Sequence, residues 1–98
     1  MQVQMTDGTF VEAIPMEGTI LVNIGLLLEN WTNGRLRATR HRVIRPTPEQ
    51  RMSLVLFVHP DENVLVKPLG NMTDENKPAI YEAVEAQKFS HKLLEDIR

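Results

Sequence analysis

The sequence predicts a mainly β chain that ends in one helix. Short apolar runs separated by Gly, Pro, Asn and Asp fill the first 66 residues, which is typical of short strands joined by turns. Near the C-terminus, Phe89, Leu93 and Ile97 recur at helical spacing, with Leu94 beside them. We therefore expect about six strands, followed by a helix that packs on them.

The N-terminal residues predict a hairpin and then a buried strand. Residues 1–5 alternate weakly in hydrophobicity, Asp7-Gly8 is a strong hairpin signal, and Thr9-Phe10-Val11 continues the second strand. A turn is expected at residues 15–18. Residues 19–24 are almost continuously apolar, which favours a strand buried on both faces.

The next segment predicts a helical turn and two short strands. Residues 26–31 fit a single helical turn, which Thr32-Asn33-Gly34 closes. Residues 36–38 and 42–44 are short strand candidates. Residues 45–48 read Arg-Pro-Thr-Pro and are expected to form a loop, because two prolines leave little room for a ladder.

The second half contains the strongest strand signal, at residues 52–58. The sequence His59-Pro60-Asp61 ends this strand, and residues 63–66 predict one more. Pro78 fits the first turn of a helix, residues 82–84 are compatible with helix or strand, and the helical spacing is clear from Glu85 onward. We divide the chain into a β portion, residues 1–70, and a linker with its helix, residues 71–98.

Composition excludes several classes of protein. The chain has no cysteine, so disulfides, zinc thiolate sites and cysteine nucleophiles are excluded. The net charge of -2 does not favour a nucleic-acid or membrane partner. The longest apolar run, residues 54–58, is far shorter than the ~20 residues that a membrane span needs. The N-terminal residues lack the pattern of a signal peptide, and we expect a cytoplasmic location.

Arg51 and Ser53 are candidate binding residues. On a strand they share one face with Val55 and Phe57, because side chains alternate between faces. A buried guanidinium needs an anionic partner, and a carboxylate held by Arg51 and Ser53 would satisfy both side chains. That carboxylate could belong to a ligand or to an internal Asp or Glu.

His41 is a candidate metal ligand, since neutral imidazole is the commonest protein ligand for divalent metals. A lone histidine is more often a structural or surface residue, and that alternative stays open on the residues alone. His59 precedes a proline at a turn and His91 lies on the predicted helix. We interpret both of them as structural or solvated.

The segment from residue 35 to residue 51 contains six arginines and one acidic residue. Such a density is compatible with phosphate binding. Trp31 is the only aromatic residue near this run, however, and single-stranded nucleic acids are usually bound on aromatic platforms. We interpret the arginines mainly as a solvated face and expect no nucleic-acid partner.

Five motifs then follow one another in the order and spacing of a known family. They are Leu21-Val22-Asn23-Ile24-Gly25, Leu28-Glu29, Trp31-Thr32-Asn33-Gly34, His41-Arg42-Val43 and Arg51-x-Ser53. With Gln2-Val3 and Asp7-Gly8 before them, they resemble the non-haem iron oxygenases similar to isopenicillin N synthase and the plant 2-oxoglutarate dioxygenases. The resemblance covers about residues 1–70 and implies part of a jelly roll, the double-stranded β-helix, with one C-terminal helix.

The resemblance also implies a function and roles for three residues. The family oxidises small organic substrates with O2, using Fe(II) held by two histidines and a carboxylate, with 2-oxoglutarate as cosubstrate. His41 matches the second histidine. Arg51 and Ser53 match the pair that binds the far carboxylate of 2-oxoglutarate, or a substrate carboxylate in isopenicillin-type members.

Two departures from the family pattern bear on activity. The His-x-Asp that supplies the other iron ligands has no match in this chain, so we expect the C-terminal part of a catalytic domain that does not hold iron firmly alone. Leu26 stands where the family usually has Asp, which could cap the helical turn. We therefore expect either an oxygenase portion that needs the missing N-terminal half or a complementing chain, or a non-catalytic remnant acting as a binding or regulatory module.

Overall fold

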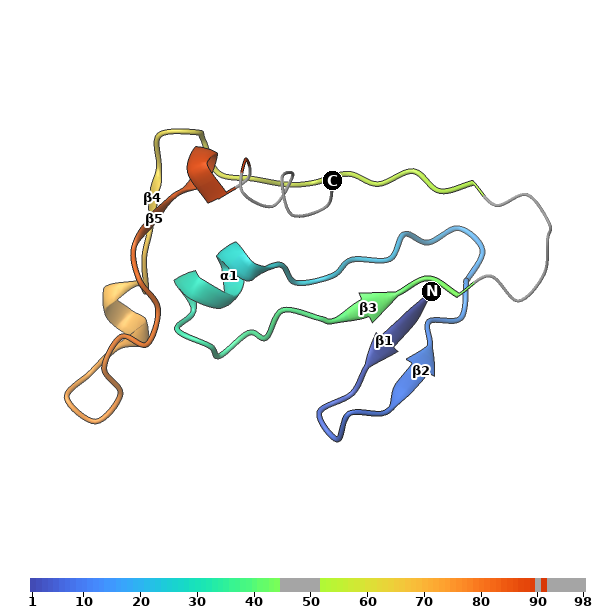
Figure 1. The fold of residues 1–98 in the computed structure, drawn as a ribbon, viewed down its shortest axis with the longest axis horizontal. Helices are drawn as coiled ribbons and strands as arrows, with labels where there is room; N and C mark the ends of the chain where they lie inside the picture. Colours follow the sequence, from blue (N-terminus) through green and yellow to red (C-terminus); the bar gives the residue numbers. More distant parts are fainter. Residues whose placement is uncertain (45–51, 90, 92–98) are drawn as a thin grey trace.

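A β-hairpin opens the computed structural model, which describes residues 1–44, 52–89 and 91 (Figure 1). Strands β1 (Gln2–Gln4) and β2 (Phe10–Glu12) are antiparallel, with Val3 opposite Val11. The connecting loop closes where Gly8 donates to the carbonyl of Met5 at 3.0 Å, and Gly8 adopts a φ of +90°. Glycine is favoured at this left-handed position, so the Asp7-Gly8 signal predicted the hairpin correctly.

Strand β3 (His41–Arg42) pairs with the other edge of β1, which gives a three-stranded sheet in the order β2-β1-β3. Val3 lies opposite His41 and Gln2 lies opposite Arg42. Since directly paired residues share a face, His41 is on the face of Val3 and Val11, and Arg42 is on the reverse face.

Helix α1 (Leu26–Trp31) forms where the sequence predicted a helical turn. Gly25 is the N-cap and provides no side-chain hydrogen bond, so Leu26 is already the first helical residue. The expected loss of a cap at position 26 is therefore wrong in detail, because an Asp there would lie inside the first turn.

The C-terminal end of α1 is closed by a left-handed turn. Asn33 has a φ of 51° and donates its backbone N–H to the carbonyl of Asn30 at 2.9 Å. Gly34 has a φ of +83° and donates to the carbonyl of Glu29, also at 2.9 Å. These two bonds make a Schellman motif, which satisfies carbonyls that the helix leaves unpaired.

A second sheet pairs β4 (Leu65–Val66) with β5 (Val84–Glu85), and the 3-10 helix η1 (Gly70–Met72) lies between them in the chain. The backbone N–H of Leu69 donates to the carbonyl of Trp31 at 3.0 Å, which ties this unit to α1. Among the described residues the buried apolar side chains are Val66 and Ala86, exposed by 0% and 2%. The core therefore lies beside α1, away from the three-stranded sheet.

Three of the predicted strands, at residues 19–24, 36–38 and 52–58, are wrong because these residues form no ladder. The backbone of residues 52–58 is nevertheless extended and runs along the upper part of Figure 1. Within the described residues, no backbone hydrogen bond involves residues 52–58. Alternate side chains there, at Met52, Leu54, Leu56 and Val58, are exposed by 86% to 102%. The residues have strand character, but a strand forms only when a neighbour pairs its N–H and C=O groups.

The boundaries of other predicted elements also differ from those in the structure. The strands predicted at 42–44 and 63–66 are shorter, at His41–Arg42 and Leu65–Val66. Pro78 does not lie in a first helical turn, because Asn33 binds its carbonyl at 3.1 Å and the N–H of Ile80 at 2.9 Å. The helix indicated from Glu85 onward is confirmed at residues 86–89. The predicted loop at 45–48 and the end of the predicted helix lie outside the described residues.

The chain is more open than an ordinary domain. Its radius of gyration is 16.2 Å, whereas a compact domain of 100 residues has about 13 Å. No helix in the described part of the chain is long and apolar enough to cross a bilayer.

Lowering the pH should loosen the β1–β2 hairpin. The side chain of Asp7 accepts hydrogen bonds from the hydroxyl and the N–H of Thr9, at 2.6 and 3.0 Å, and these bonds lower the pKa of Asp7. Because the folded-state pKa is depressed, the stabilisation is complete above the ordinary value of about 3.9 and is lost as the pH falls through the folded value. The Thr9 amide shift, followed by NMR, should report this loss. An Asp7→Asn variant that shows the same titration would contradict this assignment.

Candidate metal centre

His41 is placed in a way that suits one metal ligand. Its side chain is exposed, and Nδ1 lies 3.0 Å from the carbonyl oxygen of Thr39. When Nδ1 carries the proton and donates to that carbonyl, the lone pair of Nε2 is free. Histidines that ligate metals commonly donate their second ring nitrogen to a backbone carbonyl in this manner, which fixes the tautomer and the ring orientation.

The described residues do not complete a metal site around His41. They contain no group of three His, Asp or Glu side chains that could hold an ion. On its own face of the sheet His41 has Val3 and Val11 as its cross-strand neighbours, and these offer no ligand atoms. The residues present therefore fit one position of an iron site and leave the other protein ligands to be supplied from elsewhere.

Of the two residues predicted to bind a carboxylate, Arg51 and Ser53, the structure describes only Ser53. Ser53 lies exposed on the unpaired segment 52–58, and Arg51 is outside the described residues. Between the two described candidates, His41 and Ser53, we find no hydrogen bond. The roles of Arg51 and Ser53 stay predictions.

The other histidines differ from His41. The ring of His59 stacks on Phe57 with centroids 6.1 Å apart and planes 19° apart, a common aromatic arrangement. His91 is helical and exposed. Neither makes a contact with a carbonyl of the described residues like that of His41.

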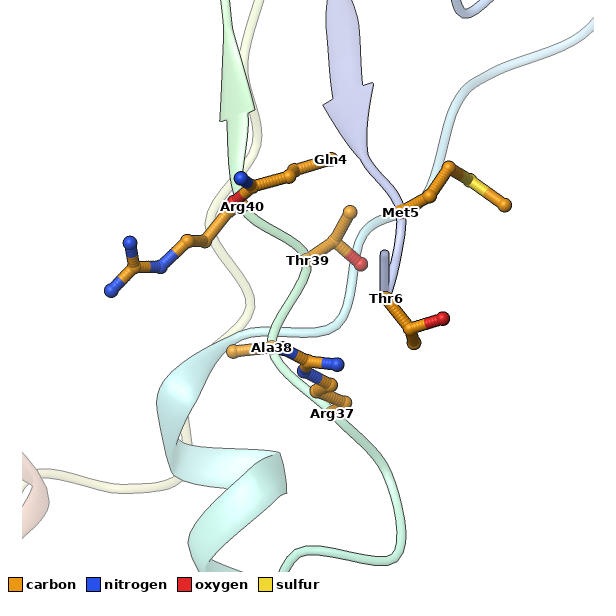
Figure 2. Close-up of a pocket in the computed structure, with 7 residues that line it drawn as sticks. All are labelled: Gln4, Met5, Thr6, Arg37, Ala38, Thr39 and Arg40. Carbon is orange, nitrogen blue, oxygen red and sulfur yellow. The ribbon is translucent and has the colours of Figure 1, made fainter. Parts of the chain in front are cut away.

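A cavity of about 100 Å³ lies between the end of β1 and the segment that leads into β3 (Figure 2). Arg37, Arg40 and Thr39 line it from the segment before β3, and Thr6 lines it from the segment after β1. His41 does not line the cavity, so the cavity is separate from the predicted metal position. Its lining residues are Gln4, Met5, Thr6, Arg37, Ala38, Thr39 and Arg40.

Sequence reasoning missed a polar cluster that fixes the C-terminal segment to α1. The side chain of Asn33 binds the carbonyls of Met72 and Pro78 and the N–H of Ile80, at 3.4, 3.1 and 2.9 Å. Asn30 is buried and donates to the carbonyl of Glu82 at 2.9 Å. The Asn33-Gly34 pair signalled the turn, but no local pattern could reveal partners about 50 residues away.

Glu29 and Tyr81 form the other half of this cluster. Oε1 of Glu29 accepts from the N–H of Ala38 at 2.9 Å, and the same carboxylate acts on the hydroxyl of Tyr81. Burial, and then the charge and hydrogen bond of Glu29, raise the pKa of Tyr81. One carboxylate thus joins α1, the segment that leads to β3, and the C-terminal part of the chain.

Comparison with known proteins identifies the class. The family model of the 2OG-Fe(II) oxygenase superfamily matches residues 1–60. A feruloyl CoA ortho-hydroxylase of Ipomoea batatas is 32% identical over 81 residues, which cover 83% of this chain and 23% of that protein. A gibberellin 2-beta-dioxygenase of Phaseolus coccineus is 31% identical over 81 residues, covering 83% and 24%.

Solved structures agree with this result. A 2OG-Fe(II) oxygenase family protein of Caulobacter crescentus superposes with a TM-score of 0.77 at 32% identity, covering 99% of this chain and 33% of that one. A Neurospora crassa protein crystallised in complex with alpha-KG has a TM-score of 0.78 at 27% identity, covering 96% and 33%. This chain belongs to the 2OG-Fe(II) oxygenase superfamily.

The family assignment confirms two sequence predictions. The fold is mainly β and forms part of the jelly roll found in these oxygenases. The family depends on Fe(II) and 2-oxoglutarate. The chain spans about a quarter of the curated relatives named above and a third of the solved ones.

Tyr81 should ionise at a higher pH than a free tyrosine. Because the folded-state pKa is raised, the contribution of Tyr81 to stability is complete below about pH 10 and is lost as the pH rises through the folded value. Tyr81 is the single tyrosine, so phenolate absorbance reports it alone. Glu29→Gln should lower the midpoint, whereas Glu82→Gln removes a carboxylate next to Tyr81 in sequence and should change it less. Equal shifts in both variants would rule out the Glu29 contact as the specific cause.

Proposed function

We propose that this chain is the C-terminal part of the catalytic domain of an Fe(II)- and 2-oxoglutarate-dependent oxygenase that oxidises a small organic substrate with O2. The observation that carries the proposal is the contact between Nδ1 of His41 and the Thr39 carbonyl, at 3.0 Å. It leaves Nε2 available to a metal within a chain that belongs to an iron-dependent family.

Each predicted site residue then has a role. Nε2 of His41 is one iron ligand, and the Thr39 carbonyl holds the imidazole in the tautomer that binding requires. Arg51 and Ser53 bind the far carboxylate of 2-oxoglutarate, because a guanidinium pairs with a carboxylate bidentately and a hydroxyl adds a hydrogen bond. When bound, iron and 2-oxoglutarate supply the activation of O2, while the protein orients the reactants and excludes water.

We further propose that residues 1–70 belong to the jelly-roll core and that residues 71–98 are a linker and helix docked on it. The bonds from Asn33 to Met72, Pro78 and Ile80 support this docking. The remaining iron ligands come from a part of the domain that precedes this match, in the same protein or in a complementing chain. We expect a cytoplasmic location.

The chain alone should not turn over 2-oxoglutarate, because its described residues supply one histidine placed as a metal ligand and no three-ligand group. Mixing it with a truncated Caulobacter crescentus relative, lacking the third that this chain matches, should restore 2-oxoglutarate consumption. In that mixture His41→Ala should lower the rate by at least about tenfold, the loss typical of a damaged metal site. Arg51→Lys should mainly raise the KM for 2-oxoglutarate, since lysine keeps the positive charge but cannot bind a carboxylate through two parallel N–H groups as a guanidinium does.

His59→Ala is the matched control, since His59 is exposed and stacks only on Phe57 among the described residues. It should leave the restored rate within about twofold of the parent chain, as surface substitutions usually do. Turnover that survives His41→Ala as well as it survives His59→Ala would sink the proposed role of His41.

A second candidate function is a non-catalytic binding or regulatory module that completes the sheet of another chain. The observation that favours it is the unpaired segment 52–58, whose alternate side chains are exposed by 86% to 102%. Such a segment offers backbone hydrogen bonds along its edges and an apolar face, as in strand addition.

If a partner strand is required, the isolated chain should show poor amide dispersion for residues 52–58 in an NMR spectrum. Dispersion should appear when the truncated relative is added, because pairing fixes the backbone. A well-dispersed spectrum from the chain as a monomer would argue against any need for a partner. Restored turnover in the same mixture would favour the oxygenase over the module.

A further inference from the structure

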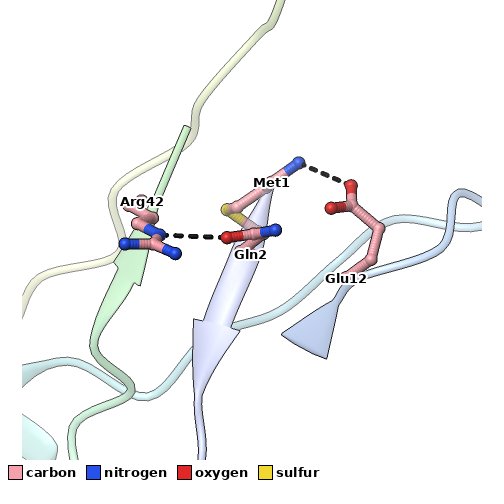
Figure 3. Close-up of polar contacts among 4 residues, drawn as sticks. All are labelled: Met1, Gln2, Glu12 and Arg42. Atoms are coloured by element: carbon pink, nitrogen blue, oxygen red, sulfur yellow. Dashed lines mark hydrogen bonds and ion pairs between the residues drawn. The ribbon is translucent and has the colours of Figure 1, made fainter. Parts of the chain in front are cut away.

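The side chain of Arg42 touches all three strands of the first sheet. From β3 its Nε donates to Oε1 of Gln2 on β1 at 2.9 Å, a contact drawn in Figure 3. Its guanidinium carbon lies 3.7 Å from the centre of the Phe10 ring on β2, which is a cation–π contact. Arg42 therefore reaches across the central strand on the face opposite to His41.

Strand β3 has few other attachments to the sheet. It contains two paired residues, and just before it the N–H of Gln4 donates to the carbonyl of Arg40 at 2.8 Å. So short an edge strand is weakly held by its ladder alone, and a slip of one residue would turn His41 to the other face. Side-chain contacts on the reverse face can therefore decide which way the imidazole points.

Among the residues that the structure describes, Arg42 contacts neutral groups. The carboxylate of Glu12 shares this face, but it pairs with the N-terminal ammonium of Met1 at 3.2 Å (Figure 3). Gln2 and Phe10 hold Arg42 by a directional hydrogen bond and by stacking. Such a clamp fixes a position more tightly than a solvated ion pair, which is weak and non-directional.

We infer that Arg42 is a positioning residue that acts through His41. By holding β3 in register on β1 and β2, it fixes the backbone of the segment in which the His41 imidazole contacts the Thr39 carbonyl two residues earlier, which leaves Nε2 as the metal-binding nitrogen. The inference rests on the proposed function in one respect, namely that the imidazole is held in place in order to bind a metal. The arrangement itself can be tested without metal.

The test is the tautomer of His41, measured by nitrogen NMR of the imidazole in the whole chain at a pH at which the ring is neutral. The parent chain should favour the form protonated at Nδ1. In Arg42→Met the ratio of this form to the Nε2-protonated form should fall about fivefold, the factor that one average hydrogen bond provides. Gln2→Leu and Phe10→Leu should lower it in the same direction. Arg42→Lys, which keeps a cation over Phe10, should recover much of it.

Two control variants separate positioning from general stability. Arg40→Met removes a nearby arginine whose side chain makes no hydrogen bond or ion pair with the described residues, and it should leave the ratio unchanged. Gly8→Ala weakens the hairpin only through its φ of +90°, because a new Cβ would meet nothing within 4 Å. A loss in Gly8→Ala equal to that in Arg42→Met would overturn the inference, as would a parent ratio equal to that of free histidine.

Zinc titration of the same samples, each mixed with the truncated Caulobacter crescentus relative that is proposed to supply the other ligands, tests the proposed function separately. If Zn²⁺ shifts the His41 resonances of the parent and of Arg42→Met with the same affinity, and the tautomer is unchanged, the positioning role fails and the ligand role stands. If the tautomer follows Arg42 while Zn²⁺ leaves His41 unaffected in every variant, the ligand role fails and the positioning of the ring stands.

Discussion

Backbone pairing is the constraint on which the described fold depends. Strand β1 has a neighbour on each side, and the sheet around it forms with strands of two or three residues. Residues 52–58 have better strand character than β1, yet within the described part of the chain they form no strand. Apolar sequence alone does not make a strand, because each N–H and C=O taken from water must find a partner.

This constraint explains which elements the sequence could predict. The Asp7-Gly8 hairpin and the turn after α1 were predictable because their signals are local and their hydrogen bonds close within a few residues. The strands expected at 19–24 and 52–58 do not form, because a strand needs a partner that is distant in the sequence. The pattern of side chains within a segment does not indicate whether such a partner exists. The helical turn expected at Pro78 is absent because Asn33 binds the backbone of Pro78 and Ile80, whereas the helix indicated from Glu85 is present at residues 86–89.

The site was predictable to a different degree. The motifs around His41 and Arg51 pointed to the family, which is confirmed, whereas their individual roles remain predictions. Periodicity gave no indication that Thr39 would contact Nδ1 of His41, or that Arg42 would reach Phe10 across β1. The contact of Arg42 depends on the register of β3, which is fixed by pairing between residues about 40 positions apart, whereas the contact of His41 joins residues two positions apart. His41 and Arg42 therefore lie on opposite faces of one short strand, and it is Arg42 that contacts the rest of the sheet.

The turn at Asn33 and Gly34 also has a consequence for the chemical ageing of the chain. An Asn-Gly pair can deamidate when the glycine nitrogen attacks the side-chain carbonyl carbon of the asparagine, closes a succinimide and expels ammonia. In the folded chain the N–H of Gly34 is engaged by the Glu29 carbonyl, and the amide of Asn33 is held by the segment from Met72 to Ile80. Folding therefore shields this bond from the reaction, and the extent of deamidation at Asn33 records how long a molecule has spent with its C-terminal segment undocked.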